Sequence, residues 1–411
     1  MTVPLAEYKR GASLPSSNPF QRLAALIADI EPLMDPIIMS IGEPQHALPD
    51  FTASVLADNI ADFRRYPAMN GTPEFRSAVG SWLDKRFHLD GLLDTENGIA
   101  PLNGSREGLS FGPIFARDYL GKTDETPVVV MPNPFYQTYA AGAHIADAQT
   151  VLMDAIPEHD FLPNLDSLSS ETLDRTIAFY VASPSNPEGS VATIDYMQRL
   201  IGLARKHNFI IFADECYSEI YRDVPPPGML EAAKMMAPSA GEVFDKIVVL
   251  NSLSKRSNLA GLRCGFAAGD PVFIKNWVRF RGLAAPQIPL PIQAVATRAY
   301  SDEGHVIENR RLYNEKYALA EKLLSPLVGK VTPDAGFFLW LNVKKWGDSV
   351  SVTKTLYRDT GVKVIPGSYL ATNHADGTNP GHDFIRVGLC PPLETTEEAL
   401  TRLATWLGGK Q

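Results

Sequence analysis

The stretch Ile247-Val-Val-Leu-Asn-Ser-Leu-Ser-Lys-Arg256 places a lysine and two serines directly after an apolar run. Its first four residues have the length and the aliphatic character of a buried strand. Ser252 and Ser254 precede Lys255, and Arg263 follows the lysine by eight residues. Hydroxyls and an arginine can hold a phosphate group, and a lysine amine can form an imine with a carbonyl group. Together these groups predict a site for pyridoxal phosphate.

Further apolar runs alternate with segments of helical period, such as residues 193–207. Continuous apolar strands that alternate with helices are typical of a mostly parallel sheet covered on both faces. In such sheets ligands bind beyond the carboxyl ends of the strands, which is where Asn186, Asp214 and Lys255 fall. The strand candidates are residues 128–131, 177–182, 209–213, 247–250 and 265–268.

A second unit is indicated from about residue 300, where long helical patterns and new strand patterns begin. The candidates there are helices at 303–324 and 394–407 and strands at 336–341 and 384–387. The strand-like run at residues 37–41 stands apart from the main series, so we expect the N-terminal segment to join this unit. We predict a large cofactor-binding domain of residues 51–299 and a small domain built from residues 1–50 and 300–411.

Composition excludes several classes of protein. The length of 411 residues suits two domains, and a formal net charge of -9 argues against nucleic-acid binding by phosphate neutralisation. The three cysteines form no Cys-x-x-Cys pair, which fits a reducing compartment. We find no secretory signal and no apolar run of bilayer length, and we expect a cytoplasmic protein that binds no membrane. The eight histidines show no metal-binding spacing, so we expect no metal.

Asp214 and Tyr217 follow the apolar residues 209–213. A carboxylate at the end of a buried strand is costly unless it is paired. The chemical interpretation is that Asp214 pairs with the protonated pyridine nitrogen, while Asn186 and Tyr217 donate to the ring hydroxyl oxygen. The ordinary alternatives are a helix cap for Asp214, a turn for Asn186 and a packed aromatic for Tyr217.

The phosphate and the face of the ring need further residues. Asn103-Gly-Ser105-Arg106 precedes a helical pattern, and a glycine with donors at a helix N-terminus is suited to a phosphate. We therefore assign Ser105 and Arg106 to the cofactor together with Ser252, Ser254 and Arg263. Tyr136, in the stretch Asn133-Pro-Phe-Tyr136, is the candidate for stacking on the ring. An ordinary helix cap and a core tyrosine are the alternatives.

Arg386 lies inside the apolar strand candidate Phe384-Ile-Arg-Val-Gly-Leu389. A buried arginine needs a partner. A structural salt bridge is one possibility. A bidentate clamp on the α-carboxylate of a substrate is the other, because the planar guanidinium matches that group.

Five motifs in order resemble one known family. The motifs are Asn186-Pro-x-Gly189, Asp214-x-x-Tyr217, Ser252-x-Ser254-Lys255, Arg263 and Arg386. They span nearly the whole chain and resemble the class I and II aminotransferases of the fold type I pyridoxal-phosphate superfamily. This resemblance implies an α/β fold with a seven-stranded, mostly parallel sheet. A narrower likeness, carried by residues 40–46, 132–136 and 252–263, is to the N-succinyldiaminopimelate aminotransferases of bacterial lysine synthesis.

The resemblance also implies a homodimer with shared active sites. Tyr66 matches the tyrosine that family dimers send to the phosphate of the neighbouring subunit, and Gly42 matches a glycine beside the substrate carboxylate. Glu188 and Ala260 stand where many relatives carry threonine and proline. Since neither residue is a chemical group of the site, we expect little effect from these two departures.

The predicted reaction is a ping-pong transamination of N-succinyl-LL-2,6-diaminopimelate with the 2-oxoglutarate and glutamate pair. Lys255 moves the proton as general base and then acid, Asp214 stabilises the electron sink, and Arg386 orients both substrates. Burial or nearby positive charge, for which Arg256 and Arg263 are candidates, would lower the pKa of Lys255. Arg106 and Arg256 are also the candidates for binding the distal carboxylates.

Other functions remain open on the same residues. The amino donor could be aspartate, alanine, N-acetylornithine or an aromatic amino acid, and the fold also hosts C–S lyases. A non-catalytic, effector-sensing regulator is a third class. The strand candidate at residues 37–41 begins too early to leave room for an N-terminal DNA-binding module.

Overall fold

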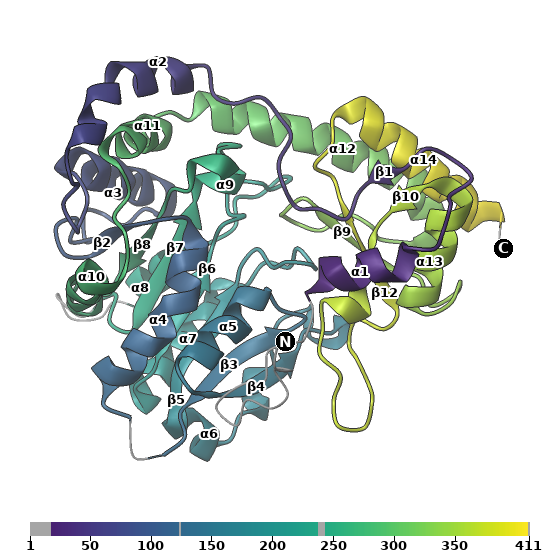
Figure 1. Ribbon diagram of the computed structural model, residues 1–411. Coiled ribbons are helices and arrows are strands. Elements are labelled where there is room, and N and C mark those ends of the chain that lie inside the picture. Colours follow the sequence, from purple (N-terminus) through teal and green to yellow (C-terminus); the bar gives the residue numbers. More distant parts are fainter. Residues whose placement is uncertain (1–17, 123–124, 237–242, 410–411) are drawn as a thin grey trace, which may run out of the picture.

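The computed structural model describes residues 18–122, 125–236 and 243–409. Its centre is a seven-stranded sheet with the strand order β2-β8-β7-β6-β5-β3-β4 (Figure 1). β8 runs antiparallel to both of its neighbours and every other pairing is parallel, so the predicted fold class is confirmed. The strands are β2 (Ile99–Leu102), β3 (Val128–Asn133), β4 (Gln149–Asp154), β5 (Thr176–Ala182), β6 (Ile210–Asp214), β7 (Ile247–Ser252) and β8 (Gly265–Gly269).

Helices cover both faces of this sheet, which explains why its central strands are continuously apolar. Two hydrophobic clusters, one on each face, contain buried side chains of the strands and of the flanking helices. On one face lie α3 (Pro73–Phe87), α6 (Ser170–Arg175), α7 (Ile194–His207), α8 (Met229–Met235) and α11 (Leu290–Tyr300). On the other face lie α4 (Ser105–Leu120), α5 (Gln137–Ile145) and α10 (Pro271–Ala284). α2 (Phe51–Asp58) packs on α11.

The two strands that the sequence did not indicate are the two edges of the sheet. β2 has four residues and contains Pro101, which cannot donate a ladder hydrogen bond and therefore suits an edge. β4 has mixed exposure and lacks the continuous apolar run that marked the central strands. Both edges thus gave a weak hydrophobic signal for a physical reason.

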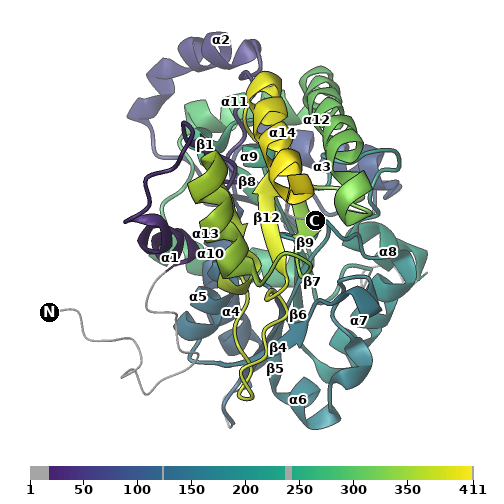
Figure 2. The ribbon, with the colours of Figure 1, turned by 90° about the vertical axis from the view of Figure 1, so that its right-hand side faces the viewer.

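A smaller unit brings the two ends of the chain together (Figures 1 and 2). β1 (Ile37–Ile38) pairs in parallel with β10 (Val362–Lys363), which brings the N-terminal segment beside the C-terminal elements. β9 (Phe338–Asn342), β11 (Ile365–Pro366) and β12 (Phe384–Gly388) form an antiparallel sheet in the order β11-β12-β9. The helices are α1 (Pro19–Ile27), α12 (Gly304–Val328), α13 (Ser349–Thr360) and α14 (Leu393–Gly409).

This smaller unit has a hydrophobic core of its own, centred on β9, β12, α12 and α14. Tyr217, which follows β6 of the large sheet, also belongs to that core. The two units therefore meet at the carboxyl ends of the parallel strands. Within the described parts of the chain, no helix combines the length and the apolar character needed to cross a bilayer.

Candidate active site

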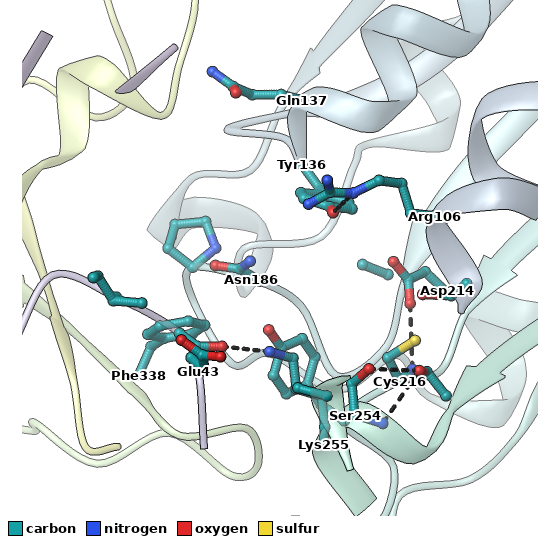
Figure 3. Close-up of a pocket in the computed structure, with 18 of the residues that line it drawn as sticks. Glu43, Arg106, Tyr136, Gln137, Asn186, Asp214, Cys216, Ser254, Lys255 and Phe338 are labelled. Carbon is teal, nitrogen blue, oxygen red and sulfur yellow. Dashed lines mark hydrogen bonds between the residues drawn. The ribbon is translucent and has the colours of Figure 1, made fainter. Parts of the chain in front are cut away.

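A cavity of about 430 Å³ lies where the carboxyl ends of β5, β6 and β7 meet the smaller unit (Figure 3). Residues from distant parts of the chain converge on it. The residues predicted from the sequence that line the cavity are Gly42, Ser105, Arg106, Tyr136, Asn186, Asp214, Tyr217, Ser252, Ser254, Lys255, Arg263 and Arg386. Tyr66 and Arg256 are the predicted residues that do not line it.

Lys255 lies on the short helix α9 (Leu253–Arg256), which begins as soon as β7 ends. Its Nζ donates a hydrogen bond to the carbonyl oxygen of Gly42 and lies 5.9 Å from the centroid of the Tyr217 ring. Burial lowers the pKa of the Lys255 amine, and Arg386 lowers it further, against an opposing effect of two cysteines. A lower pKa increases the fraction of neutral amine, which is the nucleophilic and basic form.

Asp214 is the last residue of β6, and its carboxylate is buried at one side of the cavity. It accepts hydrogen bonds from the Tyr139 hydroxyl at 2.8 Å and from the backbone N–H of Cys216 at 3.3 Å. Burial raises the pKa of Asp214, and these hydrogen bonds oppose the rise. No described cation forms an ion pair with this carboxylate, so a protonated ring nitrogen would complete it.

Arg386 lies on β12 and its guanidinium is buried at the cavity wall. Its Nη1 donates to Asn186 Oδ1 at 3.0 Å, and its Nη2 donates to the Ser40 carbonyl at 2.8 Å. Its Nε is buried without a hydrogen-bond partner, and the guanidinium stacks 4.1 Å from the ring centroid of Phe338. Burial lowers the pKa of Arg386 to about 10. No carboxylate among the described residues forms an ion pair with Arg386, so the alternative of a structural salt bridge has no partner in this part of the chain.

Asn186 and Tyr217 present polar groups to the same space. Arg386 uses Oδ1 of Asn186, so the amide nitrogen of Asn186 is the end that can donate to a ligand. Burial raises the pKa of the Tyr217 hydroxyl well above its usual value, which keeps it a proton donor. The ring of Tyr217 is held edge-on against Phe337, with the two centroids 5.2 Å apart.

A group of hydroxyls and one arginine lies around the N-terminus of α4. Ser252 Oγ and Ser254 Oγ are 2.9 Å apart, and Arg263 Nη2 donates to the Asn103 carbonyl at 3.2 Å. Gly104, at φ +77°, lets the guanidinium approach closely, because a Cβ there would lie 2.4 Å from Arg263 Nη2. Ser105 begins the helix, whose unpaired N–H groups and positive dipole end favour an anion.

Tyr136, Arg106 and Gln137 lie on one side of the cavity, and Glu43 and Phe338 lie on another (Figure 3). Arg106 is exposed, and its Nε donates to the Tyr136 hydroxyl at 2.9 Å. No carboxylate of the described residues forms an ion pair with Arg106. Arg386 and Arg106 thus line the cavity at different depths, and neither forms an ion pair with a described carboxylate.

Arg256 does not line the cavity, which corrects its assignment to the distal carboxylates. Its guanidinium is buried, donates to the Ala299 carbonyl at 2.7 Å and pairs with Glu303 at 2.5 Å. It stacks against Trp82 and Tyr300 as well. Arg256 and Arg263 are also not among the causes that lower the pKa of Lys255, where burial and Arg386 act instead.

The cavity residues that reading the sequence missed include Glu43, Tyr139, Cys216 and Phe338. Tyr139 had a usable signal, because it follows Tyr136 by three residues at the start of α5 and so shares a helix face. Glu43 and Phe338 come from the smaller unit, and nothing in their local pattern indicated that they face Lys255.

Tyr66 follows the 3₁₀ helix η2 (Ile60–Arg64) and its side chain is fully exposed. A role at a phosphate therefore requires a second copy of the chain, and this role stays a prediction.

The groups that line the cavity fit pyridoxal phosphate. The buried lysine matches its aldehyde, and the acid without a cationic partner matches its ring nitrogen. The cluster of hydroxyls and an arginine at a helix N-terminus matches its phosphate, and the two remaining donors match its ring hydroxyl. Arg386 is left for a carboxylate of another molecule.

Comparisons with known proteins agree with this chemistry. A model of the family "Aminotransferase class I and II" matches residues 35–403. The chain is 30% identical over 378 residues to an LL-diaminopimelate aminotransferase of Maridesulfovibrio salexigens, covering 90% of this chain and 91% of that one. It is 31% identical over 374 residues to an LL-diaminopimelate aminotransferase of Dehalococcoides mccartyi, with coverage of 90% and 91%.

Solved structures are similar over almost the full length. An aminotransferase from Neisseria meningitidis has a TM-score of 0.89 and 35% identity, covering 99% of this chain and 100% of that one. The aminotransferase AspB from Helicobacter pylori has a TM-score of 0.86 and 32% identity, with coverage of 95% and 98%.

Proposed function

This chain belongs to the class I and II aminotransferases, a family that depends on pyridoxal phosphate, and we propose that its amino substrate is N-succinyl-LL-2,6-diaminopimelate, with 2-oxoglutarate as acceptor. The observation that carries this proposal is the pair of arginines at two depths, Arg386 and Arg106, which have no carboxylate partners among the described residues. They match an α-carboxylate and a distal carboxylate of one substrate. The diaminopimelate named for the relatives and the likeness of residues 252–263 support the same choice.

When bound, pyridoxal phosphate supplies a carbonyl that takes up amino groups and a ring that withdraws electrons. Ser105, Ser252, Ser254 and Arg263 would hold its phosphate. The Asp214 carboxylate would hold the proton on the ring nitrogen, and Tyr139 keeps that carboxylate in place. Tyr136 is proposed to stack on the cofactor ring.

Lys255 is the proposed proton carrier. Its neutral Nζ takes the proton from the α-carbon of the amino substrate and would deliver it to the carbon of the cofactor that takes up the amino group. The lowered pKa of the amine favours the first step, because only the neutral form accepts a proton. The Gly42 carbonyl, which accepts from Nζ, fixes where the amine waits between the two steps.

Arg386 would bind the α-carboxylate and so orient the α-carbon toward Lys255. Its contacts with Asn186 and Ser40 hold the guanidinium plane, while Phe338 lies flat against it. The smaller unit thus supplies the substrate clamp and the larger unit supplies the proton carrier.

A second candidate substrate is LL-2,6-diaminopimelate itself, with its distal amine free. The names of the relatives support it, and so does Glu43, whose carboxylate lines the cavity and could pair with a distal ammonium. The remaining amino donors and the C–S lyase and regulator alternatives have no such support from the described contacts.

The test is a steady-state comparison of kcat/KM for the two diaminopimelates, aspartate, alanine, N-acetylornithine and phenylalanine, each with 2-oxoglutarate. We expect N-succinyl-LL-2,6-diaminopimelate to be preferred by at least about 10-fold, because a site built for a polar group rejects substrates that lack it. A preference for the free diaminopimelate moves the conclusion to the second candidate. Release of pyruvate and ammonia from cystathionine without transamination would overturn both.

Arg106→Met adds an internal control. We expect kcat/KM for the succinylated substrate to fall about 10- to 100-fold, in line with the loss of a hydrogen bond to a charged group. Alanine has no distal carboxylate, so its kcat/KM should stay the same. An equal fall for both substrates would show that Arg106 serves the cofactor and not the distal carboxylate.

A further inference from the structure

His46 ends the stretch Ser40-Ile-Gly-Glu-Pro-Gln-His46, of which the proposed function uses Gly42 directly. Its imidazole packs against α12, with the ring centroid 4.5 Å from that of Tyr313. Nδ1 of His46 is 2.7 Å from Asn309 Oδ1, and Nε2 is 2.7 Å from Lys316 Nζ. Both partners are buried on α12.

The groups at the two ends of this series of hydrogen bonds, backbone carbonyls at one end and the Lys316 ammonium at the other, determine the direction of each bond. Asn309 Nδ2 donates to the carbonyl oxygens of Lys255 at 3.2 Å and Arg256 at 3.4 Å, which can only accept. Asn309 Oδ1 must therefore accept from a proton on Nδ1 of His46. Nε2 of a neutral His46 is then an acceptor, and the Lys316 ammonium is its donor.

The charges around His46 require the same protonation state. Lys316 is 1% exposed, and it forms no ion pair with the described carboxylates. Its Nζ also donates to the Leu389 carbonyl at 3.1 Å, and burial lowers its pKa to about 8. Burial lowers the pKa of His46; Lys316 lowers it further, while the hydrogen bond with Asn309 and the charge of Glu308 raise it. A second proton on His46 would place an N–H against the Lys316 ammonium.

The segment that carries His46 forms one wall of the cavity. Between β1 and α2 it has no strand or helix of its own, so separate contacts fix its course. The Ser40 carbonyl accepts from Arg386, the Gly42 carbonyl accepts from Lys255, and the Ala47 carbonyl accepts from Asn258 at 3.3 Å. His46 adds the link through Asn309 to the backbone of Lys255.

We propose that neutral His46 is a positioning residue, which couples the segment bearing Gly42 to the backbone of Lys255 through Asn309, with Lys316 fixing its tautomer. The link holds the Gly42 carbonyl at the position where it accepts from the Lys255 amine. Loss of the link should therefore weaken substrate binding and slow proton transfer through those two residues. It rests on the proposed function for the identity of the reaction. Of the residues assigned to the phosphate, Ser105 and Arg263 lie outside this link, whereas Ser254 shares α9 with Lys255.

The first test needs no substrate. Hydrogen–deuterium exchange is measured on the apoprotein for peptides covering residues 39–47 and 253–258, in the wild type, His46→Phe and Gln45→Ala. Phenylalanine keeps a ring against Tyr313 and removes both hydrogen bonds, and exposed Gln45 controls for a change in the same segment. We expect at least about 10-fold faster exchange in both peptides of His46→Phe, since each 1.4 kcal/mol of lost protection is tenfold. Equal exchange in the two variants overturns the proposal.

The second test uses pH and a variant at the other end of the link. In the wild type we expect kcat/KM to fall on the acid side as His46 takes up a proton. Lys316→Met keeps the aliphatic stem and removes the cation that lowers the pKa of His46, so this acid limb should move to higher pH. In His46→Phe the contribution of this limb should disappear.

An acid limb that is unchanged in Lys316→Met would overturn the proposal even if His46→Phe failed to fold. The two proposals also separate cleanly. Should the chain prefer another amino acid, the exchange experiment and the pH shift, measured with that substrate, still decide the role of His46.

Discussion

At the scale of single residues, the site is built from charged groups that are buried before any ligand arrives. Burial raises the pKa of Asp214 and lowers that of Lys255, and both shifts favour the neutral form of the group. Arg386 is buried and has no carboxylate partner among the described residues. Such groups are costly on their own, and binding of oppositely charged ligand groups offsets that cost. Their burial is therefore a direct sign of what the cavity binds.

The unpaired guanidinium of Arg386 leads to a prediction about substrate affinity. Arg386→Lys keeps the positive charge and loses the planar pair of donors, so we expect KM for the amino substrate to rise about 10- to 100-fold. Steady-state kinetics with both substrates check this, since the α-carboxylate is common to them. Arg311→Lys is the control, because Arg311 lies in an exposed ion pair with Glu308 on α12 and should leave KM unchanged.

Glu188 gives a prediction about stability and pH. Its carboxyl is 7% exposed and its Oε1 is buried without a hydrogen-bond partner in the described structure, next to Asn186 of the cavity. Burial raises its pKa from 4.5 to about 8, against hydrogen bonds with its own backbone and Ser185. Because the folded pKa lies above the unfolded one, the contribution of Glu188 to stability is complete below pH 4.5 and is lost as the pH rises through 8.

Glu188→Gln imitates the neutral acid and does not ionise. We expect its melting temperature to equal that of the wild type near the lower end of this window and to exceed it by at least about 2 °C above the upper end. Thermal unfolding at the two pH values measures the difference. A variant less stable than the wild type at high pH would mean that the ionised carboxylate is the native form. The sequence analysis expected little effect of having Glu188 where many relatives carry threonine, and it considered only the reaction and not the stability.

At the scale of elements, the helix N-terminus of α4 and the strand ends of β6 and β7 each deliver part of the proposed cofactor site. Strands of a parallel sheet end at one edge, so residues after separate apolar runs were expected to meet there. The structure places Asp214 and Lys255 at that edge, on β6 and just after β7. The element boundaries of the central strands were predictable from continuous apolar runs. The edge strands β2 and β4 were missed, because a proline and partial exposure break their patterns.

Gly104 tests the role of the α4 terminus. In Gly104→Ala the new Cβ would meet the Arg263 guanidinium, and φ +77° disfavours any side chain. We expect the affinity of the apoprotein for pyridoxal phosphate to fall at least about 10-fold, as the loss of a charge-assisted contact implies. The control is Gly121→Ala at the other end of the same helix, which has φ +67° and open space around it. Titration of cofactor absorbance or fluorescence distinguishes local strain from loss of the phosphate site.

At the scale of the whole molecule, the cavity exists because two units with separate cores face each other. Lys255 and Asp214 come from the large sheet, whereas Gly42 and Arg386 come from segments near the two ends of the chain. A chain lacking either unit would lack half of the chemistry. This arrangement explains why the motifs of one small site are spread over nearly the full sequence.

The exposed Tyr66 leads to a prediction about assembly. Suppose that two copies share their active sites, as proposed from the family resemblance. A dimer of Tyr66→Ala then lacks this tyrosine in both sites, and a dimer of Lys255→Ala lacks the lysine in both sites. Mixing the two purified variants under exchange conditions should restore part of the activity, because one site of each mixed dimer then has both residues. Sedimentation verifies the dimer. Activity that does not rise above the sum of the separate variants would place Tyr66 outside the neighbouring site.

The sequence by itself was enough to predict the chemistry proposed for the site. Buried strands show themselves as apolar runs, and polar residues placed directly after them reach one edge of a parallel sheet. Lys255, Asp214 and Asn186 could therefore be found without coordinates. Only the tertiary structure decided which arginine enters the cavity. Neighbours along a short helix point in different directions, so Lys255 faces the cavity while Arg256 pairs with Glu303. It alone also joined His46 to Lys255 through α12, because that contact depends on how two units far apart in the sequence pack together.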